Sequence, residues 1–551
     1  MEELDRQNRA FEKRLKRQVI GKPHRFLAVV PLGFEQTFIR EFNTLGIQTT
    51  ICDPGSAQAS NHPQVVGDGK VEFTAKITET WKAVAYTRVA NRIMMHIADF
   101  KAENFRDLEK KASEIPWELY FLDDRRKTID ERGQTTLHIH VTCKHSRLYH
   151  SDAVAERLYK VIEGGSLPLA SATRHPRPFD MLRAGSGGDL PVSFTTPSAG
   201  GQHLGACSLV RMATKVGTPR NAPPQNLYVS LIDDRCTLWL DLAGEELYKR
   251  GHERFVNDAP LKETIAAGMI LEAIEFATAP SLDPSTTPSR ASLRMTQCCL
   301  LDLMAGSGTF SLEAAYMASG LIPGKCRDFA LKHQPAFKPA TWKHIVSSMD
   351  SLAPTGLRND NKKKQVPTDV TPKRDATIVT PKREAQVCPI AKIITSDISE
   401  RAVNIIRHNV ECTPLAHSPT CEQTATSISP QVHDFFTYTA KEIADASPEG
   451  SAPVIVLNPP YGKRLDFDAP ALYTRIGKKL AELARELEPF GKKLTVAILA
   501  PNDDPRPGSK FTCTANLLRE CPALDPQRNP SARRIATSHG GLGLGAFIAQ
   551  I

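Results

Sequence analysis

The sequence predicts an α/β fold with an open, mostly parallel sheet, preceded by a smaller α+β module. From residue 298 to about residue 547, short apolar runs typical of buried strands alternate with segments of helical spacing. Between residues 25 and 163, a strand–turn–helix pattern recurs, as in a small α+β sandwich. The length of 551 residues agrees with about two to four domains.

The N-terminal module is predicted from three stretches that each read as strand, turn and helix. They are RFLAVVPLGFEQTFIREFNTLGI, KVEFTAKITETWKAVAYTRVANRIMMHIADF and TTLHIHVTCKHSRLYHSDAVAERLYKVIE. In each, an apolar or alternating run gives way to apolar residues at helical spacing. Residues 1–24 precede them and begin with a polar, basic helix, which either touches RNA or is simply a solvated helix.

Two segments interrupt the predicted elements. Residues 164–225 are rich in Gly, Pro, Ser and Arg and read as a connector, and residues 351–389 carry the near repeat VTPKRDA and VTPKREA, typical of a disordered insertion. Between them, alternating runs around Asp233 and Asp234 predict a hairpin, followed by a helix. We therefore expect five segments, namely 1–24, 25–163, 164–225, 226–290 and 291–551.

Composition favours an anionic partner such as nucleic acid, because the formal net charge is +9, although a merely basic protein is the alternative. The 12 cysteines contain no C-x-x-C pair, so neither a zinc site nor a disulfide framework is indicated, and no metal is expected. The charged N-terminus does not resemble a signal peptide, and no apolar run approaches a membrane span. These features predict a cytoplasmic location.

The stretch CCLLDLMAGSGTFSLEAAYMA, residues 298–318, predicts a strand, a glycine-rich turn and a helix. Glycines let the backbone approach a ligand closely, and a helix N-terminus offers free N–H groups. No Gly-Lys-Ser/Thr follows, so the turn indicates a nucleotide-like cofactor rather than a P-loop. The residues expected at this cofactor are Asp302, Ala305, Gly306, Ser307, Gly308 and Thr309.

Two further acids follow predicted strands. Asp397 ends the strand of AKIITSD and suits the two hydroxyls of a ribose, although it could instead cap the next helix. Asp434 follows a short strand-like run and could accept from the exocyclic amine of an adenine, or could be an ordinary loop acid.

The stretch APVIVLNPPYGKRL predicts a fourth strand, which ends in Asn458. Two consecutive prolines cannot continue a central strand, so Asn458, Pro459, Pro460 and Tyr461 form a rigid turn at its end. Ligands of open α/β sheets bind at the carboxyl ends of strands. The acids, the glycine turn and this motif are therefore expected at one edge of the sheet.

In this order, these residues resemble the class I S-adenosylmethionine-dependent methyltransferases that modify exocyclic amines. DLMAGSGTFSLEAA is similar to their glycine-rich cofactor motif, and NPPYG to their catalytic motif. Leu303 and Ala305 stand where that family usually has Pro and Cys. The resemblance implies a Rossmann-like domain with a mostly parallel seven-stranded sheet over residues 291–551 and S-adenosylmethionine as cofactor.

The sequence outside these two motifs indicates a narrower family. VTCKHSRLYHSDAVAERL resembles a THUMP RNA-binding domain, and FLAVVPLGFEQTFIREFNTLGI resembles the ferredoxin-like part that accompanies it. LYVSLIDDRCTLWLDLAGEELYKRGHE and APLKETIAAGMI resemble the segment before the catalytic domain of bacterial RNA guanine-N2 methyltransferases. The family indicated is the 23S ribosomal RNA guanine-N2 methyltransferases in their single-catalytic-domain form, because the sequence has no second glycine-rich motif.

The resemblance implies methylation of the N2 amine of a guanine in 23S ribosomal RNA by a monomer. Asn458 and the Pro459 carbonyl would accept from the amine, and Tyr461 would stack on the flipped base. RNA contacts are expected from Lys144, Arg147, Tyr149, Lys463 and Arg464, all of which could instead be surface residues.

Three alternatives remain open at this point. The nearest is a transfer RNA guanine-N2 methyltransferase with the same modules. More distant are an N6-adenine methyltransferase on DNA, which the THUMP-like segment disfavours, and a non-catalytic RNA-binding ribosome-assembly factor, which the intact NPPY motif disfavours.

Overall fold

In a computed structural model, the chain forms two compact units whose segments alternate along the sequence. The first unit comprises Met1–Met95, Glu246–Arg327 and Phe337–Ile551, and the second comprises His96–Glu245 and Asp328–Ala336. No helix in the described part of the chain is both long enough and apolar enough to cross a bilayer. The structure describes residues 2–49, 62–121, 137–162, 223–252, 254–256, 260–278, 297–350, 389–417, 428–461, 467–506, 509 and 511–551.

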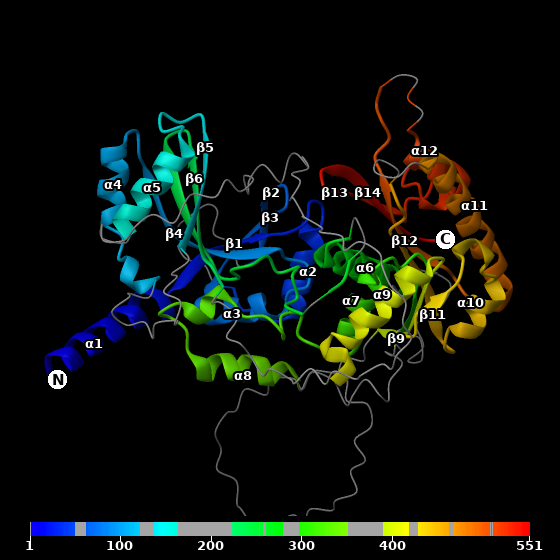
Figure 1. The fold of residues 1–551 in the computed structure, drawn as a ribbon, viewed down its shortest axis with the longest axis horizontal. Helices are drawn as coiled ribbons and strands as arrows, with labels where there is room; N and C mark the ends of the chain where they lie inside the picture. Colours follow the sequence, from blue (N-terminus) through cyan, green and yellow to red (C-terminus); the bar gives the residue numbers. More distant parts are fainter. Residues whose placement is uncertain are drawn as a thin grey trace, which may run out of the picture. The chain divides into compact units, whose positions relative to one another are not determined.

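The larger part of the first unit is an α/β domain built on a seven-stranded sheet (Figure 1). Its strand order is β10-β9-β8-β11-β12-β14-β13. The pairs from β10 to β12 are parallel, and β14 is antiparallel to both of its neighbours. This confirms the predicted mostly parallel sheet. The strands are β8 (Gln297–Asp302), β9 (Ile390–Asp397), β10 (Gln431–Val432), β11 (Ser451–Leu457), β12 (Thr495–Pro501), β13 (Arg533–His539) and β14 (Leu542–Gln550).

Helices cover both faces of this sheet (Figure 1). One face carries α6, α7 and α9, and the other carries α10, α11 and α12. Because both faces are covered, the central strands are apolar throughout, and every residue of β12 is buried. The helices are α6 (Glu263–Thr278), α7 (Thr309–Ala318), α9 (Glu400–Glu411), α10 (Ala440–Ala446), α11 (Ala469–Leu487) and α12 (Cys513–Glu520).

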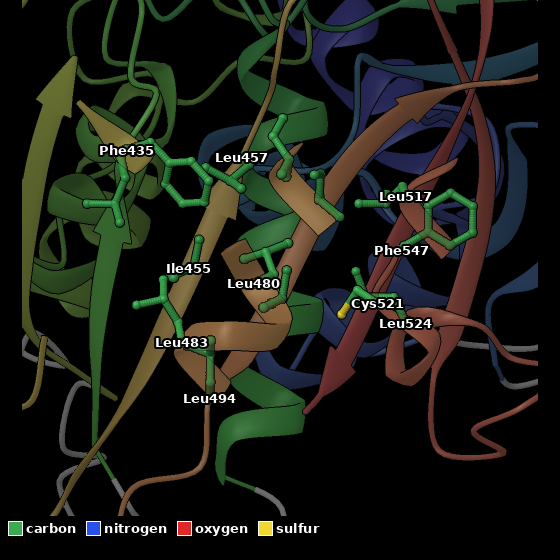
Figure 2. Packing of buried hydrophobic residues seen from close by; sticks show 14 of the residues in the cluster. Phe435, Ile455, Leu457, Leu480, Leu483, Leu494, Leu517, Cys521, Leu524 and Phe547 are labelled. Carbon is green, nitrogen blue, oxygen red and sulfur yellow. The ribbon is translucent and has the colours of Figure 1, made fainter. Parts of the chain in front are cut away.

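Helix α11 shows how the sequence builds the core of this domain. Asp468 caps its N-terminus by accepting from the Ala471 N–H at 3.0 Å. Apolar residues then recur every three or four positions and form one fully buried stripe. Figure 2 shows two of its residues, Leu480 and Leu483, among the buried side chains beside the sheet. The stripe consists of Tyr473, Ile476, Leu480, Leu483 and Leu487.

We expect Leu480→Ala to lower the free energy of unfolding by about 2–5 kcal/mol, because Leu480 is fully buried and the change leaves a cavity. Urea unfolding measures the loss. Lys478→Ala, at an exposed position of the same helix, is the control and should change stability by less than about 0.5 kcal/mol. Equal losses in the two variants would contradict the packing.

The N-terminal part of the first unit contains one end of a second seven-stranded sheet, with the strand order β2-β3-β1-β4, in which β1 lies antiparallel to β3 and β4. Its core includes Phe73, whose ring lies 5.5 Å from that of Phe26 and 4.6 Å from that of Phe42. Helix α8 (Pro339–Asp350) packs against α3. The elements are α1 (Glu2–Leu15), a π-helical turn (Lys16–Ile20), β1 (Pro23–Val29), α2 (Glu35–Thr44), β2 (Gln64–Gly67), β3 (Lys70–Lys76), α3 (Ile77–Tyr86) and β4 (Arg92–Lys101).

Strand β4 continues into the second unit, whose order is β4-β7-β6-β5. The hairpin of β6 and β7 turns at Asp233 and Asp234, with φ of 49° and 61°. We expected this hairpin and α6 in one segment, 226–290, but the hairpin pairs with β5 in the second unit while α6 lies in the first. The sequence could not show this, since the pairing of β5 with β6 is non-local. The elements are α4 (Phe105–Ser113), a 3-10 turn (Trp117–Leu119), β5 (Leu137–Lys144), α5 (Ser151–Ile162), β6 (Gln225–Ile232) and β7 (Arg235–Asp241).

The expected connector, 164–225, and insertion, 351–389, lie outside the described residues except at their C-terminal ends. The first falls between α5 and β6, and the second between α8 and β9. Both therefore stay predictions.

Candidate active site

A cavity of about 1200 Å³ lies at the carboxyl ends of β8, β9 and β11, within the first unit. The strand order reverses at this point, because β9 lies on one side of β8 and β11 on the other. Ligands of open α/β sheets bind at such a switch point. The sequence-predicted residues that line the cavity are Ala305, Gly306, Ser307, Thr309, Asp397, Asp434, Asn458, Pro459, Pro460 and Tyr461.

The two glycines of the β8–α7 loop have different roles. Gly306 has φ of +56°, and a Cβ added there would meet no atom within 4 Å. Its backbone therefore borders open space in the cavity, where a ligand can approach it. Gly308 has φ of +77°, and a Cβ there would lie 3.1 Å from the Ile406 side chain. Gly308 allows close packing against α9 and does not line the cavity.

Asp302 lies behind this loop rather than in the cavity lining, unlike the direct cofactor contact that we expected. Its Oδ2 accepts from the N–H of Ser311 at 3.1 Å and from the Ser311 hydroxyl at 2.8 Å. Burial raises the pKa of Asp302 to about 7, and the nearby Asp397 adds to the increase. Asp302 thus ties the end of β8 to the first turn of α7.

Asp397 lines the cavity and also holds the glycine loop. Its Oδ2 accepts from the Gly306 N–H at 2.8 Å, and its Oδ1 accepts from the Ser399 N–H at 2.9 Å. The N-cap of α9 is Ser399, whose side chain accepts from the Ala402 N–H, so the alternative of Asp397 as the cap is wrong. Each carboxylate oxygen retains a lone pair for a ligand hydroxyl.

Asp434 also lines the cavity. Its Oδ1 accepts from the Phe436 N–H at 3.0 Å and caps the 3-10 turn Phe435–Thr437. The residue therefore orders its own loop, as a loop acid does, and lies where a ligand can contact it. The structure therefore shows the role of a loop acid, and the expected contact with an adenine amine stays a prediction.

The NPPY turn begins directly after β11, and its four residues line the cavity. The Tyr461 hydroxyl donates a hydrogen bond to Asn458 Oδ1. Burial of the Tyr461 ring raises the pKa of its hydroxyl, so the group is protonated and a donor at neutral pH. This contact fixes the Asn458 amide and leaves its carbonyl oxygen one further lone pair.

Arg254 and Glu263 are functional candidates that the sequence reasoning missed. Glu263 lines the cavity at the start of α6, and burial raises the pKa of its carboxyl. Arg254 forms an ion pair with Glu263 and donates to Thr309 Oγ1 and, at 3.1 Å, to Ser307 Oγ. A cation and an acid thus lie beside the glycine loop, although their segment is distant in sequence.

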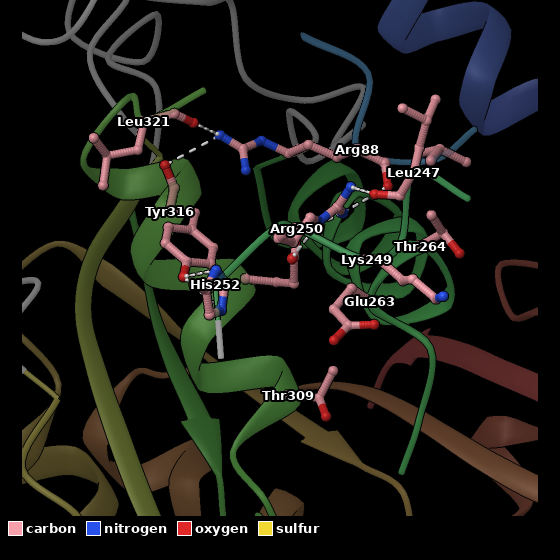
Figure 3. Close-up of polar contacts among 12 residues, drawn as sticks. Arg88, Leu247, Lys249, Arg250, His252, Glu263, Thr264, Thr309, Tyr316 and Leu321 are labelled. Atoms are coloured by element: carbon pink, nitrogen blue, oxygen red, sulfur yellow. Dashed lines mark hydrogen bonds and ion pairs between the residues drawn. The ribbon is translucent and has the colours of Figure 1, made fainter. Parts of the chain in front are cut away.

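The alternation in YKRGHERF is a signal that could have revealed this segment. Arg250, His252 and Arg254 occupy alternate positions, and each contacts α7 or the residues at its start. Figure 3 shows His252 beside Tyr316 of α7. Arg250 forms two hydrogen bonds to Glu313, of 2.9 and 3.0 Å. Burial lowers the pKa of His252 to about 4, so its ring is neutral beside the Tyr316 hydroxyl at 3.2 Å. The segment therefore runs along α7 to the cavity.

Of the predicted RNA-binding residues, those that the structure describes are not part of this cavity. Lys144 and Tyr149 lie in the second unit and are exposed; the exposed fraction of Tyr149 is 69%. Arg147 is exposed but forms ion pairs with Glu103 and Asp234. Lys463 and Arg464 lie outside the described residues, so their expected role stays a prediction.

The fold and this cavity define the class of protein. A mostly parallel seven-stranded sheet with one internal antiparallel strand, a glycine loop after β8 and an NPPY turn after β11 is the architecture of a Rossmann-like methyltransferase. Residues 290–490 match the family model described as RMKL-like, methyltransferase domain. This part of the chain is similar to that family.

Relatives and solved structures extend the likeness over more of the chain. Over 488 residues, the chain is 24% identical to the ribosomal RNA large subunit methyltransferase K/L of Aliivibrio fischeri strain MJ11, covering 87% of this chain and 49% of that protein. The chain therefore spans about half the length of the curated relatives it matches. A possible methylase from Clostridium difficile 630 and SMU.472, which was solved in complex with SAH, each have a TM-score of 0.56 at 18% identity, covering 96% of this chain and 98% of theirs. These two structures share the fold.

Proposed function

We propose that this chain transfers a methyl group from S-adenosylmethionine to the exocyclic N2 amine of a guanine in large-subunit ribosomal RNA. The observation that carries the proposal is the meeting of Gly306, Asp397, Asp434 and Asn458, which lie at or just after the ends of four strands, at one cavity. The names of the curated relatives support ribosomal RNA as the substrate, and the SAH bound by SMU.472 supports this cofactor.

The cavity residues fit the parts of this cofactor. Gly306 borders open space, so the backbone can lie against the ligand. Asp397 retains lone pairs for the two ribose hydroxyls, and Asp434 has an oxygen that can accept from the adenine amine. Glu263, a buried acid beside Arg254, suits the ammonium of the amino-acid end. When bound, the cofactor supplies a methyl group on a sulfonium, which is a strong electrophile.

The NPPY turn would orient the substrate amine, which is a poor nucleophile because its lone pair is delocalised into the ring. Asn458 Oδ1 and the Pro459 carbonyl would accept from the amine hydrogens and hold the lone pair toward the methyl group. The Tyr461 hydroxyl holds the Asn458 amide in one orientation, and its ring would contact the flipped base. The two prolines keep the turn rigid, so little ordering is needed on binding.

The test of this function identifies both the RNA and the base. The full chain is incubated with radiolabelled S-adenosylmethionine and separated RNAs, and the RNA is digested to nucleosides. We expect label in N2-methylguanosine from the large-subunit RNA. Label in transfer RNA would favour the transfer RNA alternative, label in N6-methyladenine would favour the adenine alternative, and absence of label from every nucleic acid would favour a non-catalytic role.

We expect Asp397→Ala to weaken binding of S-adenosylmethionine about 10- to 150-fold, since hydrogen bonds to a charged group contribute about 1.5–3 kcal/mol. Isothermal titration calorimetry measures the affinity. Asp445→Ala, at an exposed position on α10, is the matched control and should bind as the parent does. An unchanged affinity in Asp397→Ala would remove Asp397 from the cofactor site.

We also propose that the second unit is a THUMP-like module that contacts RNA through Lys144, Arg147 and Tyr149. The exposure of all three side chains supports this role. Deletion of residues 1–163 is a poor test, because it would remove strands β1 and β3 of the first unit. Lys144→Gln combined with Tyr149→Ala keeps the fold, and RNA affinity unchanged in that variant would contradict the assignment.

A further inference from the structure

A second hollow lies in the first unit, along α9. It has a volume of about 590 Å³, within the range of about 300–1,000 Å³ that small-molecule sites occupy. None of its lining residues lines the larger cavity. The two adjoin in sequence, since Phe255 lines this groove and Val256 lines the cavity. The groove is lined by Phe255, Glu400, Arg401, Asn404, Ile405 and His408.

The backbone of Phe255 is held by hydrogen bonds, while its side chain is exposed to solvent. Asn409, which is fully buried, accepts from the Phe255 N–H at 2.8 Å and donates to the Phe255 carbonyl at 2.9 Å. The same amide donates to the Ser307 carbonyl at 3.1 Å, so Phe255 is tied to the glycine loop. Yet 49% of Phe255 is exposed. An exposed apolar ring whose backbone is held in place is suited to contact a partner.

The groove offers an aromatic face and polar groups to one flat ligand. The ring of His408 lies edge-on to Phe255, with centroids 4.5 Å apart. Arg401 and Asn404 offer hydrogen-bond donors, and the structure gives Arg401 no ion-pair partner within the residues it describes. Glu400 can accept from an amine but repels a phosphate. This combination favours a nucleobase over a backbone phosphate.

We propose that this groove binds a nucleobase of the RNA substrate close to the methylated nucleotide, with Phe255 as its stacking platform. The inference rests on the proposed function, since it takes RNA as the substrate. Phe255 follows Arg254, which contacts Ser307 and Thr309, and α9 begins three residues after Asp397. A base seated here therefore lies beside the glycine loop, which lines the same cavity as the NPPY turn, and we infer that it helps to select which nucleotide enters that cavity.

The experiment compares Phe255→Ala with Phe490→Ala in the full chain. Phe490 is a matched control, because 47% of it is exposed and it lies outside both hollows. Affinity is measured for transcribed large-subunit ribosomal RNA and for a short single-stranded RNA, without methyl donor. Loss of one base–aromatic stack should weaken RNA binding of Phe255→Ala about 5- to 100-fold. Phe255→Trp should restore it, and binding of S-adenosylhomocysteine should stay unchanged.

Each outcome decides the proposal. Equal RNA affinities of Phe255→Ala and Phe490→Ala would overturn the proposal. Absence of RNA binding by the parent chain would overturn it too. So would a Phe255→Ala variant that loses S-adenosylhomocysteine binding but keeps RNA binding. Weaker RNA binding by Phe255→Ala supports it even if the parent methylates no RNA, and that result would contradict the proposed function alone. Arg401→Gln changes an exposed residue and is a second test of the groove. We again expect weaker RNA binding.

Discussion

Asn458→Ala is expected to reduce methyl transfer at least 100-fold, on the scale of about 10²–10³ that loss of one preorganised hydrogen-bonding group costs. The variant removes the oxygen that would accept from the substrate amine and that now accepts from the Tyr461 hydroxyl. Cofactor affinity should change little, because Asp397 and the glycine loop are intact. Single-turnover transfer of a radiolabelled methyl group measures the rate.

Two further variants serve as a control and as a test of the Tyr461 hydrogen bond. Asn43→Ala changes an exposed Asn on α2, outside the cavity, and should transfer methyl groups as the parent does. Tyr461→Phe removes the donor to Asn458 but keeps the ring, so we expect a lower kcat with unchanged cofactor affinity. Full activity of Asn458→Ala would refute its assignment as the acceptor.

Arg250→Met is expected to lower the free energy of unfolding of the chain by about 3–5 kcal/mol. The side chains of Arg250 and Glu313 are 2% and 1% exposed, and the guanidinium also donates to the Arg88 carbonyl at 2.9 Å. Removing the cation leaves Glu313 as a buried charge without its counterion. Urea unfolding measures the loss.

The controls separate burial from charge pairing. Arg157→Met breaks the Arg157–Glu109 pair, whose side chains are 46% and 41% exposed, and should cost about 0–1 kcal/mol. Adding Glu313→Leu to Arg250→Met removes both charges and should recover part of the loss. If Arg250→Met costs no more than Arg157→Met, the buried pair does not stabilise α7 as inferred.

Much of the cavity could be predicted because each of its main residues follows a local pattern. Apolar runs marked β8 and β11, and a shorter apolar run marked β9. A rule about strand ends then placed Gly306, Asp397 and Asn458 at one edge. No long-range contact had to be known for this step, since the carboxyl ends of parallel strands meet at the same edge. The sequence also predicted that Asp302 contacts the cofactor directly. In the structure its side chain instead accepts a hydrogen bond from Ser311.

The partners of these residues could not be predicted in the same way. Arg254 reaches Ser307 and Thr309 across more than fifty residues of sequence, and Asn409 fixes Phe255 from another helix. Such contacts depend on how helices pack, which no local periodicity encodes. The division into units shows the same limit, because the β6–β7 hairpin joins β5 rather than the segment that follows it.

The sequence by itself determined the α/β class, the mostly parallel sheet and which residues lie at its edge, because strand burial, glycine turns and the NPPY turn are local consequences of residue type. Only the tertiary structure showed which side chains support the residues at that edge of the sheet. Asp302 supports α7, Asp397 holds the Gly306 N–H, and Tyr461 orients Asn458. The physical reason is that a buried polar group must find a partner, and only the folded chain determines which partner is within reach.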